Sequence, residues 1–259
     1  MSRTRERGPI WARPAPGSRQ PRFTREQIAQ AAIAIADEEG FAEVSMRRVA
    51  DMIGAGTMTL YHYVRTKDDL LALIEDALMA ESLVPDHEMP LGWRARLTAI
   101  ARRARDTMTR HPWALHSLRG ARMGPNELRH IEQSMAAVAD APLSPEDRLE
   151  LIAVLDDFAF GCSLRAADAP GDAFQDPQAV RAFNKIVAGQ VGGGAFPHLA
   201  AFIGRDTPAQ AFSRAARAMN DERRFEFGVE AILDAAERRG RARPQPAQSD
   251  RARVIRARR

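Results

Sequence analysis

A run of polar and aromatic side chains at residues 57–67 is the part of the sequence best equipped for chemistry. It reads TMTLYHYVRTK and holds hydroxyl groups, ring N–H groups and the cations Arg65 and Lys67. Hydroxyl and ring N–H groups can hydrogen-bond base edges in a major groove, and an apolar body such as Met58 can contact a thymine methyl. The two cations can supply the phosphate contacts that set the register of a protein on DNA. The composition of this run therefore indicates contact with nucleic acid.

Two apolar residues in the run predict a helix with one inward face. Leu60 and Val64 lie one turn apart and can pack inward together. The other side chains then cover the remaining faces, and a helix that only filled a core would not expose so many hydroxyls and aromatic polar tips. The outward set is Thr57, Met58, Thr59, Tyr61, His62 and Tyr63. We interpret this helix as a recognition helix.

Two further helices are predicted before it, each with a start and a stop signal. Thr24 and Gln27 have the spacing of a capping box, and Gly40 can end the first helix with a positive φ. Ser45 is suited to cap the second helix, which ends at Gly54. Three small helices with a glycine-containing turn between the last two form a helix-turn-helix.

Residues 24–73 resemble the tetracycline-repressor (TetR) family of transcriptional regulators. The resemblance is carried by the first helix ending at Gly40-Phe41, the run VSMRRVADMIG, the Thr59-Leu60-Tyr61 core of the third helix, and Lys67 with Leu70 and Leu71. By position, it implies DNA contacts from the start of the second helix, from the third helix and from the start of a fourth. These residues are Ser45, Met46, Arg47, Thr57, Met58, Thr59, Tyr61, His62, Tyr63 and Lys67.

The composition predicts a folded protein without a membrane partner. The chain has 259 residues, of which 45% are hydrophobic, enough for a substantial core. A single cysteine, Cys162, excludes an intramolecular disulfide and a zinc site built on several thiolates. No apolar run approaches the roughly 20 residues that span a bilayer, and the amino terminus lacks a signal-peptide stretch. We therefore expect a cytoplasmic protein.

The charge is concentrated at the two ends of the chain. Residues 1–22 carry six Arg and one Glu, residues 238–259 carry nine Arg and one Asp, and the residues between carry a net −9. Such tails can bind phosphate without reading sequence, or can simply be solvated ends. We expect flexible basic tails at 1–22 and 240–259, a helix-turn-helix DNA-binding domain at 23–66, and a helical effector-binding and dimerisation domain at 67–239.

The remaining sequence predicts an all-α fold, in which the N-terminal three-helix helix-turn-helix domain is followed by a larger helical ligand-binding and dimerisation domain. Ser144-Pro145 signals the start of a helix over 145–167. From Leu151 to Leu164 this helix is apolar on nearly every side, which predicts burial all round. The last helix is expected at 221–238.

Those two helices are the candidates for pairing two copies of the chain. A single helix-turn-helix contacts few base pairs, so two-fold pairing is the usual route to affinity and specificity. The family resemblance implies that both helices and their symmetry mates form a four-helix bundle. The candidate interface residues are Leu155, Ala159, Phe225, Gly228, Val229 and Ile232.

A cavity among the central helices could bind a small-molecule effector, and the bound effector could tilt the fourth helix. This tilt would change the spacing between the two helix-turn-helix units of a dimer. Asp156 and Asp157 could neutralise a cationic ligand, or could instead meet arginines in or across the dimer interface. The candidate lining residues, each with plain core packing as the alternative, are Trp93, Met108, Trp113, His116, Met135, Phe158, Phe160 and Cys162.

Patterns that would indicate an enzyme are absent from the sequence. There is no G-x-S-x-G elbow, P-loop or H-E-x-x-H pair, and His111 and His116 do not have the i, i+4 spacing of a helical metal pair. We expect no metal and no cofactor. The predicted function is a dimeric transcriptional repressor that binds a near-palindromic double-stranded DNA operator and is released by a small-molecule effector. The alternative is a helical protein–protein interaction adaptor without specific DNA reading.

Overall fold

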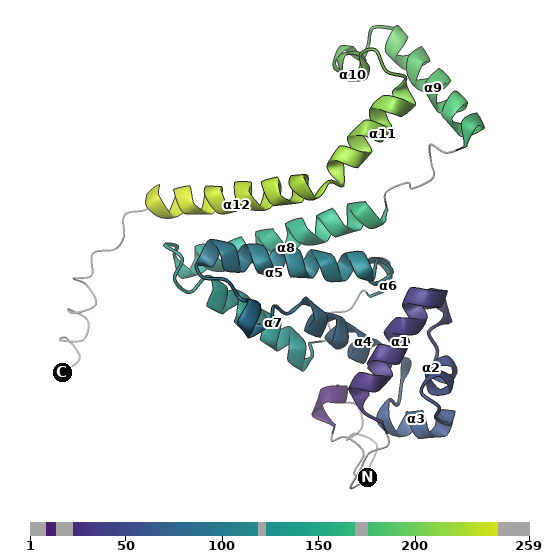
Figure 1. The fold of residues 1–259 in the computed structure, drawn as a ribbon, viewed down its shortest axis with the longest axis vertical. Helices are drawn as coiled ribbons and strands as arrows, with labels where there is room; N and C mark the ends of the chain where they lie inside the picture. Colours follow the sequence, from purple (N-terminus) through teal and green to yellow (C-terminus); the bar gives the residue numbers. More distant parts are fainter. Residues whose placement is uncertain (1–8, 14–22, 119–122, 169–175, 243–259) are drawn as a thin grey trace, which may run out of the picture.

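The computed structural model describes residues 9–13, 23–118, 123–168 and 176–242. Within these ranges every regular element is a helix, which confirms the all-α fold class (Figure 1). The expectations for most of the two basic tails lie outside the described residues. The elements are η1 (Ile10–Ala12), α1 (Arg25–Glu39), η2 (Phe41–Glu43), α2 (Met46–Met52), α3 (Thr57–Tyr63), α4 (Lys67–Ser82), η3 (Asp86–Glu88), α5 (Trp93–Arg110), α6 (Ala114–Ser117), α7 (Pro125–Ala137), α8 (Pro145–Ala167), α9 (Pro177–Gly192), α10 (Pro197–Ile203), α11 (Pro208–Met219) and α12 (Glu222–Ala242).

Helices α1 to α3 begin and end where the local signals predict. The Thr24 hydroxyl accepts from the Gln27 amide at 3.1 Å, and the Gln27 side chain accepts from the Thr24 amide at 2.9 Å, so the capping box forms. Gly40 follows α1 with φ of 96°, a conformation that a residue with a side chain rarely adopts. Ser45 caps α2 by accepting from the Arg48 amide at 3.2 Å.

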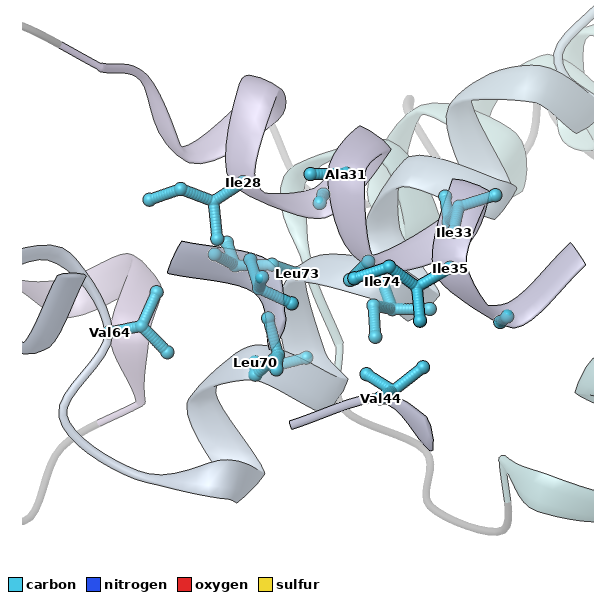
Figure 2. Close-up of a cluster of buried hydrophobic side chains, with 14 of the residues drawn as sticks. Ile28, Ala31, Ile33, Ile35, Val44, Val64, Leu70, Leu73 and Ile74 are labelled. Atoms are coloured by element: carbon cyan, nitrogen blue, oxygen red, sulfur yellow. The ribbon is translucent and has the colours of Figure 1, made fainter. Parts of the chain in front are cut away.

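Helix α4 connects the helix-turn-helix unit formed by α1, α2 and α3, which we call the reading unit, to the rest of the molecule. It packs against both. Leu70, Leu73 and Ile74 are buried in the cluster that α1 and α3 also fill (Figure 2). Farther along, the Asp76 carboxylate accepts from the backbone amide of Asn126 at 2.8 Å and from its side chain at 2.7 Å. Helix α4 thus packs on the first core and is bound to α7, and the expected boundary between residues 66 and 67 lies at its start.

Helices α5, α8 and α12 form the second core. Leu97, Leu151 and Phe225 are among its buried residues. Helix α12 approaches α8 at Gly228, where a Cβ atom would overlap the ring of Phe158. The arginines of α5 meet acidic residues of α12 at the edge of this core, as in the bidentate pair of Arg102 with Glu226 at 2.5 Å. That hydrogen-bonded pair lowers the pKa of the Glu226 carboxyl.

Two expectations about α8 and α12 are wrong for the single chain. First, α8 is not buried all round, since Val154 and Phe160 are 44% and 50% exposed. Second, most of the expected interface residues lie inside the protomer. Leu155, Ala159, Phe225 and Val229 are at most 3% exposed, Ile232 packs against the same cluster, and Gly228 faces Phe158. These apolar faces are covered by neighbouring helices of the same chain, so they leave little surface for a second copy.

Helices α9, α10 and α11 project from the body as an arm (Figure 1). They pack mainly on one another, with Phe212 in edge-to-face contact with Phe183 at 5.6 Å and with Phe202 at 5.8 Å between ring centroids. Helix α9 has no buried residue. Among the described ranges, no helix combines the length and apolar character that crossing a bilayer requires.

Part of the amino-terminal segment is ordered against the reading unit, which corrects the expectation of a flexible tail over residues 1–22. Ile10 is 1% exposed and belongs to the core shared by α1 and α4. Arg13 forms an ion pair with Asp69, and Arg25 donates to the Arg13 carbonyl at 3.0 Å. Ile10, the partly buried Trp11 and the polar contacts of Arg13 hold this segment, and none of them has a periodic signal in a Pro- and Arg-rich sequence.

Candidate nucleic-acid interface and effector cavity

Helix α3 is anchored by two side chains and presents the others. Leu60 is 1% exposed and Val64, just after the helix, is fully buried, which confirms the predicted inward face. Met58 and Tyr61 are 76% and 42% exposed. A seven-residue helix is too short to be stable alone, so its orientation depends on this anchoring.

The ten predicted DNA-contact residues lie at the start of α2, along α3 and at the start of α4. Six are exposed and four are partly buried. Among the partly buried ones, Met46 and Tyr63 pack against the reading-unit core, and the Tyr63 ring meets Phe23 edge-on at 6.5 Å between centroids. The exposed residues are Ser45, Arg47, Met58, Tyr61, His62 and Lys67; the partly buried ones are Met46, Thr57, Thr59 and Tyr63.

The cations around α2 differ in how strongly they are held by the protein. Arg48 is tied to Glu39, with its Nε donating at 3.1 Å, and this hydrogen bond lowers the pKa of the Glu39 carboxyl. Arg47 is 87% exposed and its Nε lies 3.9 Å from Asp51 Oδ2, at the limit of an ion pair. Such an exposed pair contributes little energy, so Arg47 can exchange Asp51 for a phosphate at small cost.

The turn between α3 and α4 is fixed by capping hydrogen bonds. The Thr66 hydroxyl accepts from the Asp69 amide at 3.0 Å, and the Asp69 carboxylate accepts from the Arg65 amide at 3.0 Å. Lys67 therefore starts α4 in a defined direction close to α3. A cation beside an exposed recognition helix is suited to contact the DNA backbone.

A polar and aromatic junction joins the end of α1 to the start of α6. His111 Nδ1 lies 2.8 Å from Asp37 Oδ1, and its Nε2 lies 3.2 Å from Glu81 Oε2 on α4. Trp113 donates from its indole to Asp37 at 2.7 Å and stacks on Phe41 at 5.3 Å between centroids. This junction therefore links α4 and the start of α6 to the end of α1.

Two adjoining hollows lie between α4, α5, α7 and α8, with volumes of about 310 and 240 Å³. They share the lining residues Met79, Met108, Glu127 and Phe160, so we treat them as one cavity. A separate groove of about 920 Å³ lies between η3 and α7 and is lined by no residue of α4 or α8. In the part of the chain that the structure describes, no group of three or more His, Cys, Asp or Glu side chains is arranged to hold a metal ion.

Only two of the eight candidate lining residues, Met108 and Phe160, line this cavity. Trp93, Phe158 and Cys162 pack against the second core. The other three lie elsewhere. Trp113 is at the α1–α6 junction, and Met135 is on the surface with 45% exposure. The Nε2 atom of His116 lies 3.0 Å from Asp168 Oδ1.

Among the polar residues that line the cavity, Glu127 and His130 of α7 were not expected there. Their i, i+3 spacing, which puts both on one helical face, was the available signal. Of the two aspartates considered for a cationic ligand, Asp156 lines the cavity and Asp157 does not. Partial removal from solvent raises the pKa of Asp156; His130 opposes this effect, whereas Asp157 and Glu127 add to it.

The fold is all-helical, its third helix faces outward, and a cavity lies beside the connecting helix. These features define a helix-turn-helix regulator with a cavity for a ligand. Comparison with known families agrees with this. Residues 28–74 match the family "Bacterial regulatory proteins, tetR family", and residues 85–239 match "Tetracyclin repressor-like, C-terminal domain". The chain belongs to the TetR family and is a DNA-binding transcriptional regulator, not an enzyme.

Similar proteins support the assignment over most of the chain. The transcriptional repressor DrrR1 of Streptomyces coeruleorubidus is 31% identical over 242 residues, covering 90% of this chain and 85% of that protein. The repressor Rv1353c of Mycobacterium tuberculosis is 29% identical over 239 residues, covering 86% and 85%. Among solved structures, Streptomyces coelicolor ActR in complex with actinorhodin superposes with a TM-score of 0.58 at 26% identity, covering 83% of this chain and 95% of that one.

Proposed function

We propose that the protein is a homodimeric repressor that binds a near-palindromic operator and releases it when a small molecule occupies the cavity. The observation that carries the proposal is the orientation of α3, whose polar and aromatic residues face outward while Leu60 and Val64 hold it to the core. A protein with this activity works where the DNA is, so we place it in the cytoplasm.

The residues of α3 and its flanks divide into two roles by their chemistry. Arg47 and Lys67 flank α3 and are suited to the phosphate contacts that position the helix. Tyr61, His62 and the hydroxyl of Thr57 are suited to base edges, and Met58 to a thymine methyl. Occupation of a promoter by such a protein blocks polymerase without further machinery, which favours repression.

Surface left open on α8 and α12 supports a dimer. Phe227 of α12 is 75% exposed and Val154 of α8 is 44% exposed, although both belong to helices of the second core. The arm formed by α9–α11 also exposes apolar side chains, with Ile186 at 66%. A second copy of this chain, related by two-fold symmetry, would cover α8 and α12 with the same helices and bring a second α3 to the operator.

The position of the cavity supports control by a ligand. Glu75 and Met79 of α4 contribute to its lining, so a bound molecule touches the helix that begins with Lys67. A ligand shifts the operator-bound and released states only by its difference in affinity for them, and contact with α4 supplies a physical origin for such a difference. The similar protein ActR has been solved with actinorhodin.

A gel-shift titration with the DNA upstream of the protein's own gene, at two salt concentrations, tests the proposal. A repressor gives saturable binding, and the logarithm of its affinity falls linearly with that of the salt concentration in proportion to the phosphates contacted. A helical adaptor that does not read DNA gives no saturable shift, and that result would remove the proposed function.

A further inference from the structure

We propose that the cavity between α4, α5, α7 and α8 takes an amphipathic effector that carries a positive charge, such as a protonated amine on a compact apolar ring system. The proposal rests on the function proposed above, because it concerns the same cavity. It specifies the chemical class of the ligand from the arrangement of apolar and acidic groups in the lining.

One part of the lining is apolar. Met79 and Met108 lie on α4 and α5, Phe160 on α8, and Leu115 and Leu118 belong to the α6 segment. Methionine side chains adapt to ligands of different outline and make favourable contacts with aromatic rings. A wall of this kind removes the apolar part of a ligand from water, which favours binding.

The other part of the lining is acidic. Glu127 of α7 and Asp156 of α8 both border the smaller hollow. Among the described residues, no Lys or Arg lines the smaller hollow, and no salt bridge involves Glu127 or Asp156. By contrast, Glu226 at the edge between α5 and α12 is paired with Arg102.

A second observation points to a missing polar partner in the same place. His130 also lines the smaller hollow, and its Nδ1 is buried without a hydrogen-bond partner among the described residues. A buried ring nitrogen without a partner is costly and is usually satisfied in a native structure. An ammonium or a hydroxyl of a ligand that reaches the carboxylates can also satisfy this nitrogen.

The acidic residues are connected to the element that must move. Asn126 is the neighbour of Glu127, and its amide and side chain bind Asp76 of α4 at 2.8 and 2.7 Å. Gly124 allows this approach, because a Cβ atom there would overlap the Asp76 carboxylate. A cation that draws Glu127 toward Asp156 therefore pulls the start of α7, and α4 with it. The charge of the ligand, as well as its bulk, acts on the reading unit.

Three probes of one shape and different charge test the proposal by isothermal titration calorimetry on the full chain. They are 1-naphthylmethylamine, 1-naphthalenemethanol and 1-naphthoate, which are cationic, neutral and anionic at neutral pH. We expect the amine to bind at least about tenfold more tightly than the alcohol, a difference of about 1.4 kcal/mol, and the carboxylate to bind most weakly. Equal affinities for amine and alcohol, tighter binding of the carboxylate, or no binding of the amine would overturn the proposal.

Variants locate the effect within the cavity. The double change Glu127→Gln and Asp156→Asn should abolish the preference for the amine, whereas Asp157→Asn, a neighbour outside the lining, should keep it. A preference that survives the double change would also overturn the proposal. Gel shifts of each variant without a probe separate the two hypotheses: operator binding that persists while the amine shows no preference removes the cationic effector and leaves the regulator intact.

Discussion

Helix α3 shows at the scale of residues how a reading surface can be built from side chains that contribute little to stability. Leu60 and Val64 supply its anchor, and the outward residues are free to be chosen for contact with bases. Met46 and Tyr63 are intermediate, since each packs partly on the core. Substitutions at these two positions therefore change both the orientation of the helix and the surface that it presents.

Separate alanine substitutions of Tyr61 and Lys67 should weaken operator binding without affecting folding. For Tyr61→Ala we expect a loss of about 1–3 kcal/mol in binding free energy that depends on the operator sequence, because a base contact is removed. For Lys67→Ala we expect weaker binding to all sequences and a reduction of the salt slope by about one, because a phosphate contact is removed.

Gel shifts at several salt concentrations measure both effects. Lys185→Ala, which removes an exposed lysine of α9, is the matched control and should bind as the unaltered protein does. Loss of folding or of dimerisation in the Tyr61 or Lys67 variant would show that the reading surface lies elsewhere.

Asp156 makes the stability of the folded protein depend on pH in a defined direction. Its pKa is raised in the folded state above the ordinary value of about 3.8, so the folded protein holds this proton more tightly than the unfolded chain does. Stability therefore falls as the pH rises from about this value through the raised pKa. Asp156→Asn removes this loss.

Relative to the unaltered protein, the Asn variant should thus be more stable at pH 7 than at pH 4, by less than about 1 kcal/mol because the side chain is partly solvated. Urea unfolding at a series of pH values measures the difference. A stability difference that is constant from pH 4 to pH 7 would contradict this account.

At the scale of elements, the close approach of α8 and α12 depends on one glycine. The Phe158 ring occupies the space beside Gly228 and stacks on Phe225 with 5.7 Å between centroids. The substitution Gly228→Ala places a methyl group against that ring, which must move or push the helices apart. We expect a destabilisation of about 1–3 kcal/mol, typical of overpacking.

Gly189→Ala in α9 is the matched control for this change. Nothing lies within 4 Å of a Cβ atom at that position, so the gain in helix propensity should stabilise the chain by up to about 1 kcal/mol. Urea unfolding of both variants gives the comparison. Equal effects of the two substitutions would show that the α8–α12 contact is looser than the structure indicates.

Elements also explain how a cavity in the body can act on a distant recognition helix. Helix α4 packs on α1, borders the cavity and is bound to α7 through Asp76. The junction of His111 and Trp113 with Asp37 provides a second connection between the body and α1. The reading unit is thus held at two points, and a ligand that shifts α4 changes the relation between them.

At the scale of the whole molecule, the proposed homodimer depends on the outer faces of α8 and α12. Phe227→Glu puts a charge on the most exposed phenylalanine of α12 without disturbing the protomer core. We expect the dimer to dissociate, because an unpaired charge buried in an interface costs several kcal/mol. Analytical ultracentrifugation measures the mass.

Leu91→Glu provides the control for this substitution. Leu91 is 90% exposed in the loop before α5, and its replacement should leave the mass unchanged. A Phe227→Glu variant that sediments as the unaltered protein does would assign the interface to other surfaces, with the arm formed by α9–α11 as the next one to test.

Local interactions made much of the fold predictable from the sequence. The capping box of Thr24 and Gln27, the cap at Ser45 and the positive φ of Gly40 are formed by residues close together in the chain, so their spacing specifies them. The same holds for the inward pair Leu60 and Val64. Together they predicted an all-α fold with an exposed third helix, and the resemblance of residues 24–73 added the TetR family.

Only the tertiary structure decided which surface covers each apolar face. Hydrophobic periodicity shows that a face is buried but does not identify its partner, and for this reason Leu155 and Val229 were expected between two chains and lie inside one. The lining of the cavity, which includes both Glu127 and Asp156, and the burial of Ile10 likewise depend on helices that are far apart in sequence. Such contacts follow from the packing of the whole chain, which no local spacing specifies.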